Sequence, residues 1–143
     1  MKRNRIVATT LAALALVAGG AAVTTTVASA SDEPRCYGFI VSDGKRTIYN
    51  RVDDPIGQVE LWYNPDTGKN CVMTRNYLGR YATLTATLRV SDGRSEYVSG
   101  KWRYYSDGAT LYAPGKCVAY SGAVYGGNAT DTGTASRGFG NCG

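Results

Sequence analysis

Histidine is absent from all 143 residues of the chain. Without it the chain cannot form the Ser-His or Cys-His pair that activates a nucleophile, and it offers no imidazole ligand for a metal. It also lacks the side chain whose ordinary pKa suits proton transfer near neutral pH. These classes of catalytic site are therefore excluded.

Cysteine is scarce, and its spacing is unlike that of a metal site. Cys36, Cys71, Cys117 and Cys142 are separated by 35, 46 and 25 positions, whereas a structural zinc site needs close pairs such as Cys-x-x-Cys. No Gly-rich phosphate loop leads from a strand into a helix, and residues 126–128 are typical of a turn. The sequence therefore predicts neither a metal nor a cofactor.

The excess of positive charge is small once the N-terminus is set aside. The chain has sixteen Lys and Arg against eleven Asp and Glu, a net charge of +5. Lys2, Arg3 and Arg5 are three of the basic residues, so residues 31–143 keep thirteen against eleven, a net charge of +2. Nucleic-acid binding needs a basic stripe in the folded part, so we expect no nucleic-acid partner.

Residues 1–30 are typical of a secretory signal peptide. Basic residues precede a largely apolar stretch at 6–18, and Ala28-Ser29-Ala30 is a small-residue cleavage site. We expect a helical signal cleaved before Ser31, which leaves a single domain of residues 31–143. An uncleaved membrane anchor is the alternative, because weakly polar residues extend the apolar run. No twin arginine or lipid-anchor cysteine is present, so we expect release by general secretion and no membrane association afterwards.

Alternation with period two dominates the predicted domain. Between positions 81 and 90, every second residue is apolar, while Tyr81, three threonines and Arg89 share the other face, as in a half-buried strand. Further strands are expected at 47–52, 59–63, 71–74, 96–98, 102–105, 109–112 and 117–120, with a weak one near Phe139. This pattern predicts a mainly β fold, either a small antiparallel sandwich or a barrel with short hairpins.

Turn residues separate these strands. The segment 64–68, Asn-Pro-Asp-Thr-Gly, lies between two β-prone runs and predicts a hairpin. Ser-Asp-Gly occurs at 42–44, 91–93 and 106–108, and Asp-Gly is favoured in tight hairpins. The Gly-rich stretch from 122 to 140 is expected to be a loop with at most an edge strand.

The four cysteines predict two disulfides, because their number is even and the chain is exported. Three pairings are compatible with four cysteines. We favour Cys36–Cys71 with Cys117–Cys142, because each bridge closes a separate half of the chain and the second fastens the Gly-rich tail to a strand. A closed loop of this size contributes about 3 kcal/mol of stability.

Aromatic residues are abundant after the signal, with eleven tyrosines in the chain. Trp62, Trp102, Tyr104 and Tyr105 are the candidates for an exposed binding surface, since such rings combine a large apolar face with a polar tip. The alternative is cross-strand aromatic pairing that only stabilises the sheet.

The acidic residues present no evident catalytic pair. A glycosidase holds two carboxylates on either side of its substrate bond, yet most aspartates here lie in predicted turns, where they hydrogen-bond the local backbone. Asn128-Ala129-Thr130 matches a glycosylation acceptor, but so short a pattern also arises by chance. We expect a protein without enzymatic activity.

Four segments that each contain a cysteine form a recognisable set. They are Cys36-Tyr37-Gly38-Phe39, Thr67-Gly68-Lys69-Asn70-Cys71-Val72, Ala113-Pro114-Gly115-Lys116-Cys117-Val118-Ala119-Tyr120-Ser121-Gly122 and Asn141-Cys142-Gly143. In this order they resemble the spore-associated protein A family of small secreted actinobacterial proteins. The resemblance covers most of residues 36–143. It implies a location at the spore or cell envelope and no known reaction.

Together these observations predict a secreted, non-enzymatic monomer that associates with a spore-surface or cell-envelope component, by binding or as a structural part. The alternative is an extracellular binding module or inhibitor, directed at a glycan or a protease. Its contact surface would be the exposed aromatic strands or the Gly-rich loop.

Overall fold

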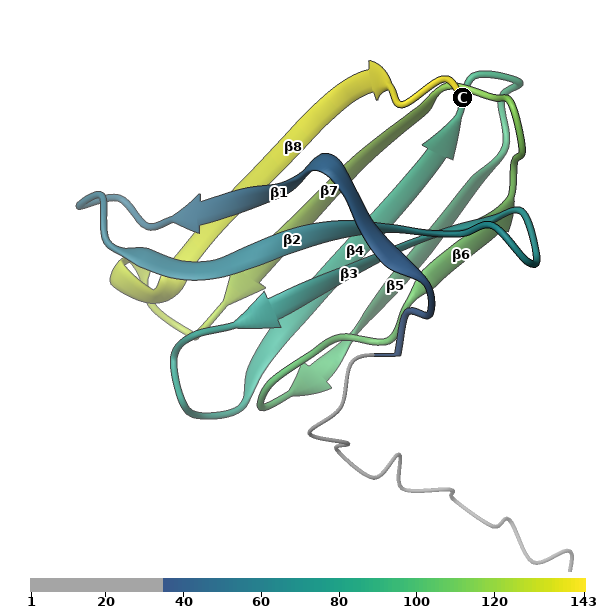
Figure 1. Cartoon of the computed structure of the whole chain (residues 1–143). Coiled ribbons are helices and arrows are strands. Elements are labelled where there is room, and N and C mark those ends of the chain that lie inside the picture. Colours follow the sequence, from purple (N-terminus) through teal and green to yellow (C-terminus); the bar gives the residue numbers. More distant parts are fainter. Residues whose placement is uncertain (1–34) are drawn as a thin grey trace, which may run out of the picture.

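A computed structural model describes residues 35–143 as two antiparallel sheets of four strands each (Figure 1). Sheet A has the strand order β1-β2-β3-β6, and sheet B has the order β5-β4-β7-β8. The elements are β1 (Phe39–Tyr49), β2 (Pro55–Asn64), β3 (Lys69–Asn76), β4 (Ala82–Val90), β5 (Ser95–Trp102), β6 (Ala109–Tyr112), β7 (Val118–Tyr125), the short 3₁₀ helix η1 (Ala129–Asp131) and β8 (Thr132–Gly140). The predicted mainly β fold is confirmed, and it consists of two separate sheets rather than one closed barrel.

The predicted signal peptide and its cleavage site fall on residues 1–34, which lie outside the described residues. Within residues 35–143, no helix is long and apolar enough to cross a membrane.

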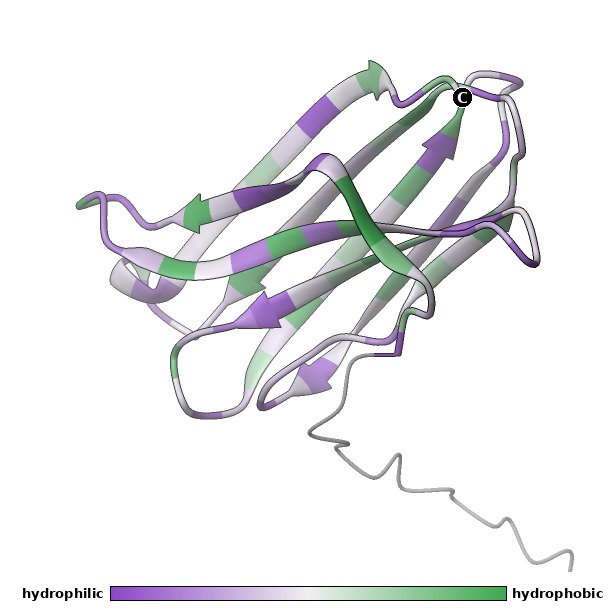
Figure 2. Ribbon diagram, in the orientation of Figure 1, coloured by the Kyte–Doolittle hydropathy of each residue, from purple (hydrophilic) through white to green (hydrophobic). Residues whose placement is uncertain are grey.

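The two sheets enclose one hydrophobic core, and β4 shows how the sequence builds it. Leu84 and Leu88 are fully buried, while the threonines between them lie on the opposite face of the strand. Figure 2 shows hydrophobic segments interspersed with less hydrophobic ones along the strands of both sheets. Val59 and Leu61 of β2 and Val72 of β3 belong to the same core cluster and come from sheet A. Burying a side chain of this kind stabilises the fold by about 1.5–3 kcal/mol, so the alternation predicted from the sequence directly supplies the interface between the sheets.

Two of the predicted hairpins are confirmed. Between β2 and β3, the Gly68 N–H donates to the Asn64 carbonyl at 2.8 Å. Between β4 and β5, the Gly93 N–H donates to the Val90 carbonyl at 3.0 Å, and Gly93 has a φ of 95°, which only glycine adopts readily. Local turn chemistry was therefore sufficient to place these two connections.

The other two Ser-Asp-Gly triplets do not form hairpins, and that expectation is wrong. Residues 42–44 lie inside β1, where the pairing with β2 shifts register between Ile40 and Lys45. Residues 106–108 lie in the connection that carries the chain from β5 in sheet B to β6 in sheet A. Asp-Gly bends the backbone locally, but long-range pairing decides which strands the bend connects.

The Gly-rich stretch from 122 to 140 is mostly strand rather than loop, and it contains β8, an edge strand of sheet B, as the expectation allowed. β7 continues to Tyr125 and β8 begins at Thr132, so only residues 126–131 connect them. At Gly122 the two sheets approach so closely that a Cβ would lie 2.2 Å from Thr74 Oγ1. Glycine is required here by packing between the sheets rather than by a turn.

Two disulfides join the pairs that the sequence favoured. Cys36–Cys71 ties the segment before β1 to β3, with the two Cα atoms 5.6 Å apart. Cys117–Cys142 ties the start of β7 to the residues that follow β8, with a Cα distance of 4.0 Å. Every cysteine of residues 35–143 is bridged.

Candidate binding surface

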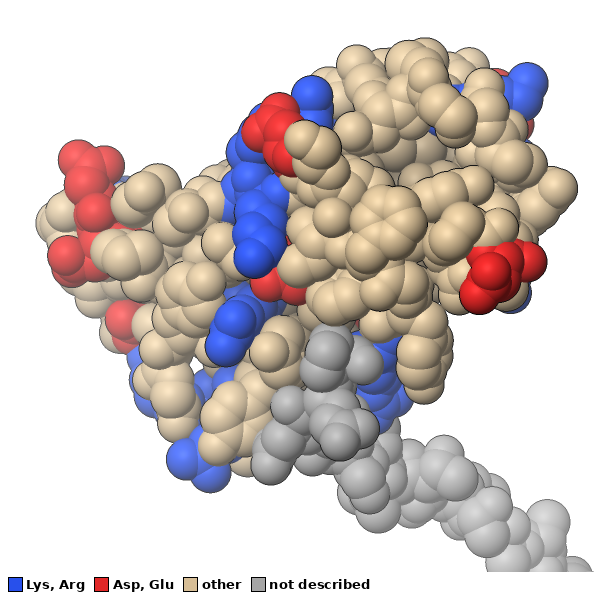
Figure 3. Space-filling model, viewed as in Figure 1, with Lys and Arg blue, Asp and Glu red and all other residues tan. Residues whose placement is uncertain are grey.

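The outer face of sheet A, turned away from sheet B, carries a second organised set of side chains. Because Val59 and Leu61 point into the core, the intervening Glu60 and the following Trp62 lie on the outer face. Opposite them on β3, Glu60 pairs with Met73 and Trp62 pairs with Cys71. Strands β1 to β3 face the viewer in Figures 1 and 3, and Figure 3 shows basic side chains running across them.

A small apolar cluster anchors this face. Cys36, Cys71 and Met73 are buried, and Trp62 and Tyr105 pack against them partly exposed. Tyr105 reaches the site because it forms a β-bridge with Arg75 next to the edge of sheet A. The structure therefore brings together two of the four predicted aromatic residues, Trp62 and Tyr105.

Trp102 does not belong to a surface, which corrects the prediction for this residue. It is only 7% exposed and lies in the core, where Ala82 is its partner on β4. Its ring folds back over Gly100, where a Cβ would lie 2.6 Å from Trp102 Cη2. The predicted strand at 102–105 also differs, since β5 ends at Trp102 and of the next three residues only Tyr105 is paired. Trp102 points inward because it continues the alternation of β5, which begins at Ser95. A strand predicted to start at residue 102 does not include this alternation, so the burial of Trp102 was not predicted.

Tyr104 is exposed and lies in the connection between β5 and β6. The Arg103 guanidinium carbon lies 5.3 Å from the centre of its ring, and the Tyr104 carbonyl accepts a hydrogen bond from the Asn76 N–H at 2.7 Å. Its backbone is thus fixed while its ring stays accessible.

Arg75 is held between two aromatic rings. Its guanidinium carbon lies 5.7 Å from the ring centre of Tyr77 and 5.5 Å from that of Tyr105, distances that allow cation–π attraction to both. Within the described part of the chain it has no salt bridge to a carboxylate. An exposed arginine oriented in this way can present its N–H groups to a carboxylate or phosphate.

Glu60 is the one carboxylate among residues 35–143 that is buried, at 4% exposure. Its Oε2 accepts a hydrogen bond from Trp62 Nε1 at 3.2 Å, and Lys45 is its cross-strand partner on β1. The Trp62 indole is thereby held in a fixed orientation. We call Glu60, Trp62, Arg75, Tyr77 and Tyr105 the Arg75 surface.

Burial raises the pKa of Tyr77 above its ordinary value of 10.0, with Arg75 acting in the opposite direction and Glu60 adding to the rise. The phenol therefore stays protonated near neutral pH and is a hydrogen-bond donor. Arg75, Tyr77 and the burial of Glu60 were not predicted from the sequence. Extending the alternation of residues 71–74 to position 77 would have found the first two.

Two aspartates elsewhere have a lowered pKa, which favours their ionised form. A hydrogen bond from Arg46 lowers the pKa of Asp43, and one from Arg94 lowers the pKa of Asp92. A general acid at neutral pH needs the opposite shift. In the part of the chain that the structure covers, no three His, Cys, Asp or Glu residues are grouped closely enough to hold a metal.

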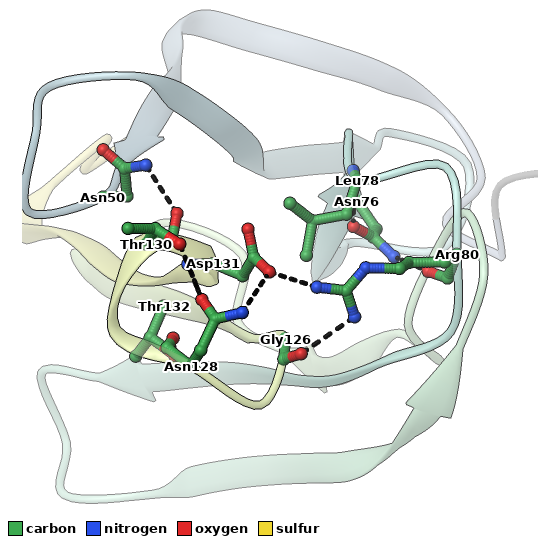
Figure 4. A network of polar contacts seen from close by, with 9 residues as sticks. All are labelled: Asn50, Asn76, Leu78, Arg80, Gly126, Asn128, Thr130, Asp131 and Thr132. Atoms are coloured by element: carbon green, nitrogen blue, oxygen red, sulfur yellow. Dashed lines mark hydrogen bonds and ion pairs between the residues drawn. The ribbon is translucent and has the colours of Figure 1, made fainter.

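A polar network fixes the loops at one end of the sandwich (Figure 4). Arg80 forms an ion pair with Asp131 and donates to the Gly126 carbonyl, which joins the β3–β4 loop to the β7–β8 loop. Asn50, in the β1–β2 loop, donates a hydrogen bond to the Thr130 carbonyl.

Asn128 is the residue of the glycosylation pattern, and it caps η1. Its side chain accepts a hydrogen bond from the Asp131 N–H at 2.9 Å and donates one to Asp131 Oδ2. Its side chain therefore has a structural role in this loop.

Fold and surface together define a small, disulfide-bonded β-sandwich protein with an aromatic and basic outer face. The chain belongs to the spore-associated protein A family. It is 30% identical over 122 residues to Spore-associated protein A of Streptomyces coelicolor, an alignment that covers 82% of this chain and 79% of that protein. No protein-family model matches the chain, and no solved structure matches it significantly.

Proposed function

We propose that this chain is a secreted, non-enzymatic protein that associates with the spore or cell envelope by binding through the Arg75 surface. The observation that carries the proposal is the placement of Arg75 between Tyr77 and Tyr105, on the sheet face that also carries the partly exposed Trp62. The name of the Streptomyces coelicolor relative supports a spore location, and two disulfides suit an oxidising compartment outside the cytosol.

The chemistry of this surface favours an envelope polymer as its partner. Flat aromatic faces stack on sugar rings, while an oriented guanidinium and the neighbouring Lys45 attract carboxylate or phosphate groups along such a polymer. The only carboxylate on the surface is buried beneath these side chains, so it does not repel an anionic ligand as an exposed one would. Residues fixed by sheet pairing and by a disulfide lose little conformational entropy on binding.

A second candidate function is that of an extracellular inhibitor or protein-binding module. The observation in its favour is the loop end of the sandwich, where exposed Tyr77 and Tyr81 lie on the β3–β4 loop that the network of Figure 4 ties to the β7–β8 loop. The exposed Tyr104 is held separately, by the hydrogen bond from the Asn76 N–H to its carbonyl. Rigid loops that display aromatic side chains are suited to a protein partner.

The test is sedimentation of the purified mature domain with isolated spores and cell walls over a range of salt concentrations. We expect Arg75→Ala to weaken binding at least about tenfold, a loss typical of an important interface residue. The matched control is Arg89→Ala on sheet B, because Arg89 also lies over an aromatic ring, that of Phe139, at 5.7 Å. Equal losses in the two variants, or binding by neither wild type nor control, would refute the role of this surface.

The absence of catalysis needs a separate assay on cell-wall glycans and peptides. We expect no turnover by the wild-type domain. Cleavage that falls at least about a hundredfold in Glu60→Gln, as when a general acid or base is removed, would show that the protein is an enzyme.

A further inference from the structure

A cavity of about 330 Å³ opens at the end of the sandwich where β2 and β3 form their hairpin. It is lined by Val41, Tyr63, Asn70 and Ala113, and by the chain that follows β8 at residues 141–143. Its volume is at the lower end of the range found for ligand pockets, about 300–1,000 Å³. We call it the Asn70–Asn141 pocket.

Asn70 is an exception among the buried polar residues. Of the six in the described chain, five use their side chains in hydrogen bonds: Asn50, Glu60, Thr74, Asn76 and Ser106. Asn70 is 5% exposed, and no hydrogen bond joins its carboxamide to residues 35–143, yet its amide atoms are not among the buried atoms that lack a partner, so they are open to the cavity. An amide that is fixed in the wall of a cavity and makes no bond within the protein is available to a ligand there.

Asn141 provides a second, independent amide at the same cavity. Its Nδ2 is buried, and no acceptor for it exists among the residues that the structure describes. Its backbone has a φ of 49°, a conformation that asparagine tolerates better than most other residues. Two carboxamides from opposite parts of the chain therefore line one cavity, and the one of Asn141 has a buried N–H group without an acceptor.

Covalent anchors hold both amides in place. Asn70 precedes Cys71, which is bridged to Cys36, and Asn141 precedes Cys142, which is bridged to Cys117. Tyr63 lies directly beside Asn70 as its cross-strand partner, and the Gly115 N–H donates to a main-chain oxygen of Gly143 at 3.3 Å. The Thr-Gly-Lys-Asn-Cys and Asn-Cys-Gly segments, far apart in the sequence, thus meet at one preorganised site.

The lining decides the class of ligand. None of the side chains that line the pocket is charged, and the α-carboxylate of Gly143 at its wall disfavours an anionic ligand but can accept hydrogen bonds from hydroxyl groups. A carboxamide offers one donor group and one acceptor, and an acetamido group presents the complementary pair. Val41 and Ala113 supply apolar contacts for its methyl group, and the Tyr63 ring offers a flat face to a pyranose.

We propose that the Asn70–Asn141 pocket binds an N-acetylated sugar. The site lies apart from the Arg75 surface and shares no residue with it, so the proposal goes beyond the function proposed above and does not depend on it. Loss of binding to spores in Arg75→Ala and loss of sugar binding in pocket variants would be separate results.

The experiment follows the side-chain amide signals of the ¹⁵N-labelled mature domain by NMR during titration with N-acetylglucosamine. Glucose and N-methylacetamide are titrated in parallel, as the sugar without the acetamido group and the amide without the sugar. We expect N-acetylglucosamine to shift the Nδ2 signals of both asparagines with millimolar affinity, and each of the other two probes to bind at least about tenfold more weakly, which corresponds to one lost hydrogen bond.

Asn70→Leu is the test variant, and Tyr97→Ala on the exposed face of sheet B is the control. Because the Asn70 carboxamide makes no internal hydrogen bond, Asn70→Leu should keep its melting temperature while its affinity for N-acetylglucosamine falls at least about tenfold. The control should bind as the wild type does. A strongly lowered melting temperature in Asn70→Leu would show that the residue has a structural role and overturn the proposal. So would unchanged sugar affinity in that variant, equal binding of glucose or N-methylacetamide, or no shift of either asparagine.

Discussion

The two disulfides close loops of similar size but differ in burial, and this difference predicts unequal losses of stability. The separations are 25 residues for Cys117–Cys142 and 35 for Cys36–Cys71. The entropy of the unfolded chain alone then gives about 3.5 and about 3.8 kcal/mol for removing each bridge. Loop size by itself therefore predicts nearly equal effects.

Burial separates the two cases. Cys36 and Cys71 are 3% and 4% exposed and pack with Met73, so replacing each buried sulfur by the hydrogen of alanine costs about another 1 kcal/mol. Cys142 is exposed and Cys117 only half-buried, so little packing is lost there. We expect a loss of roughly 5–6 kcal/mol for Cys36→Ala/Cys71→Ala, against roughly 3–4 kcal/mol for Cys117→Ala/Cys142→Ala.

Urea unfolding of the mature domain measures both losses. The midpoint concentration and the slope must be compared together, because a changed slope reports altered compactness of the unfolded chain. A loss for Cys117→Ala/Cys142→Ala equal to or larger than that for Cys36→Ala/Cys71→Ala would refute the argument from burial. Peptide mapping that links Cys71 to Cys117 would refute the pairing itself.

Three further predictions address packing, pH and processing. Gly122→Ala should destabilise the domain by about 1–3 kcal/mol through overpacking between the sheets, whereas Gly138→Ala, whose added Cβ would have no neighbour within 4 Å, should change urea stability little. The hydrogen bond from Arg46 lowers the pKa of Asp43 from 3.8, so the stabilisation from this group is complete above pH 3.8 and is lost as the pH falls through the lower pKa of the folded state. As the pH falls through this acidic range, the melting temperature of Asp43→Asn should therefore decrease less steeply than that of the wild type. Parallel curves of melting temperature against pH would contradict this prediction. Secreted material should begin at Ser31 and show no alkylation without prior reduction, and an intact mass that retains residues 1–30 would contradict the cleavage.

Local patterns carried the fold class and most of the strands. The alternation at 81–90, the turn residues at 64–68 and 91–93 and the even cysteine count all act over a few residues or through a covalent constraint. For that reason each of these three patterns could be interpreted without knowing which distant segments of the chain contact one another in the folded protein. Of the five residues of the Arg75 surface, only Trp62 and Tyr105 were predicted from the sequence. The outward position of Trp62 follows from alternation within its own strand, whereas Tyr105 reaches the surface through a bridge to a strand thirty positions earlier, which no local pattern indicates.

The sequence by itself determined that this is a small β protein with two bridges, since period-two alternation and turn dihedrals are properties of the local backbone. Tertiary structure alone decided which aromatic rings are accessible. Trp102 is in the core because the strand that carries it begins seven residues earlier and packs over Gly100. The tertiary structure also decided that Gly122 lies between closely packed sheets and that Asn70 and Asn141 line the same cavity. Such features depend on how two sheets stack, and stacking is set by contacts between residues far apart in the chain, which no short segment encodes alone.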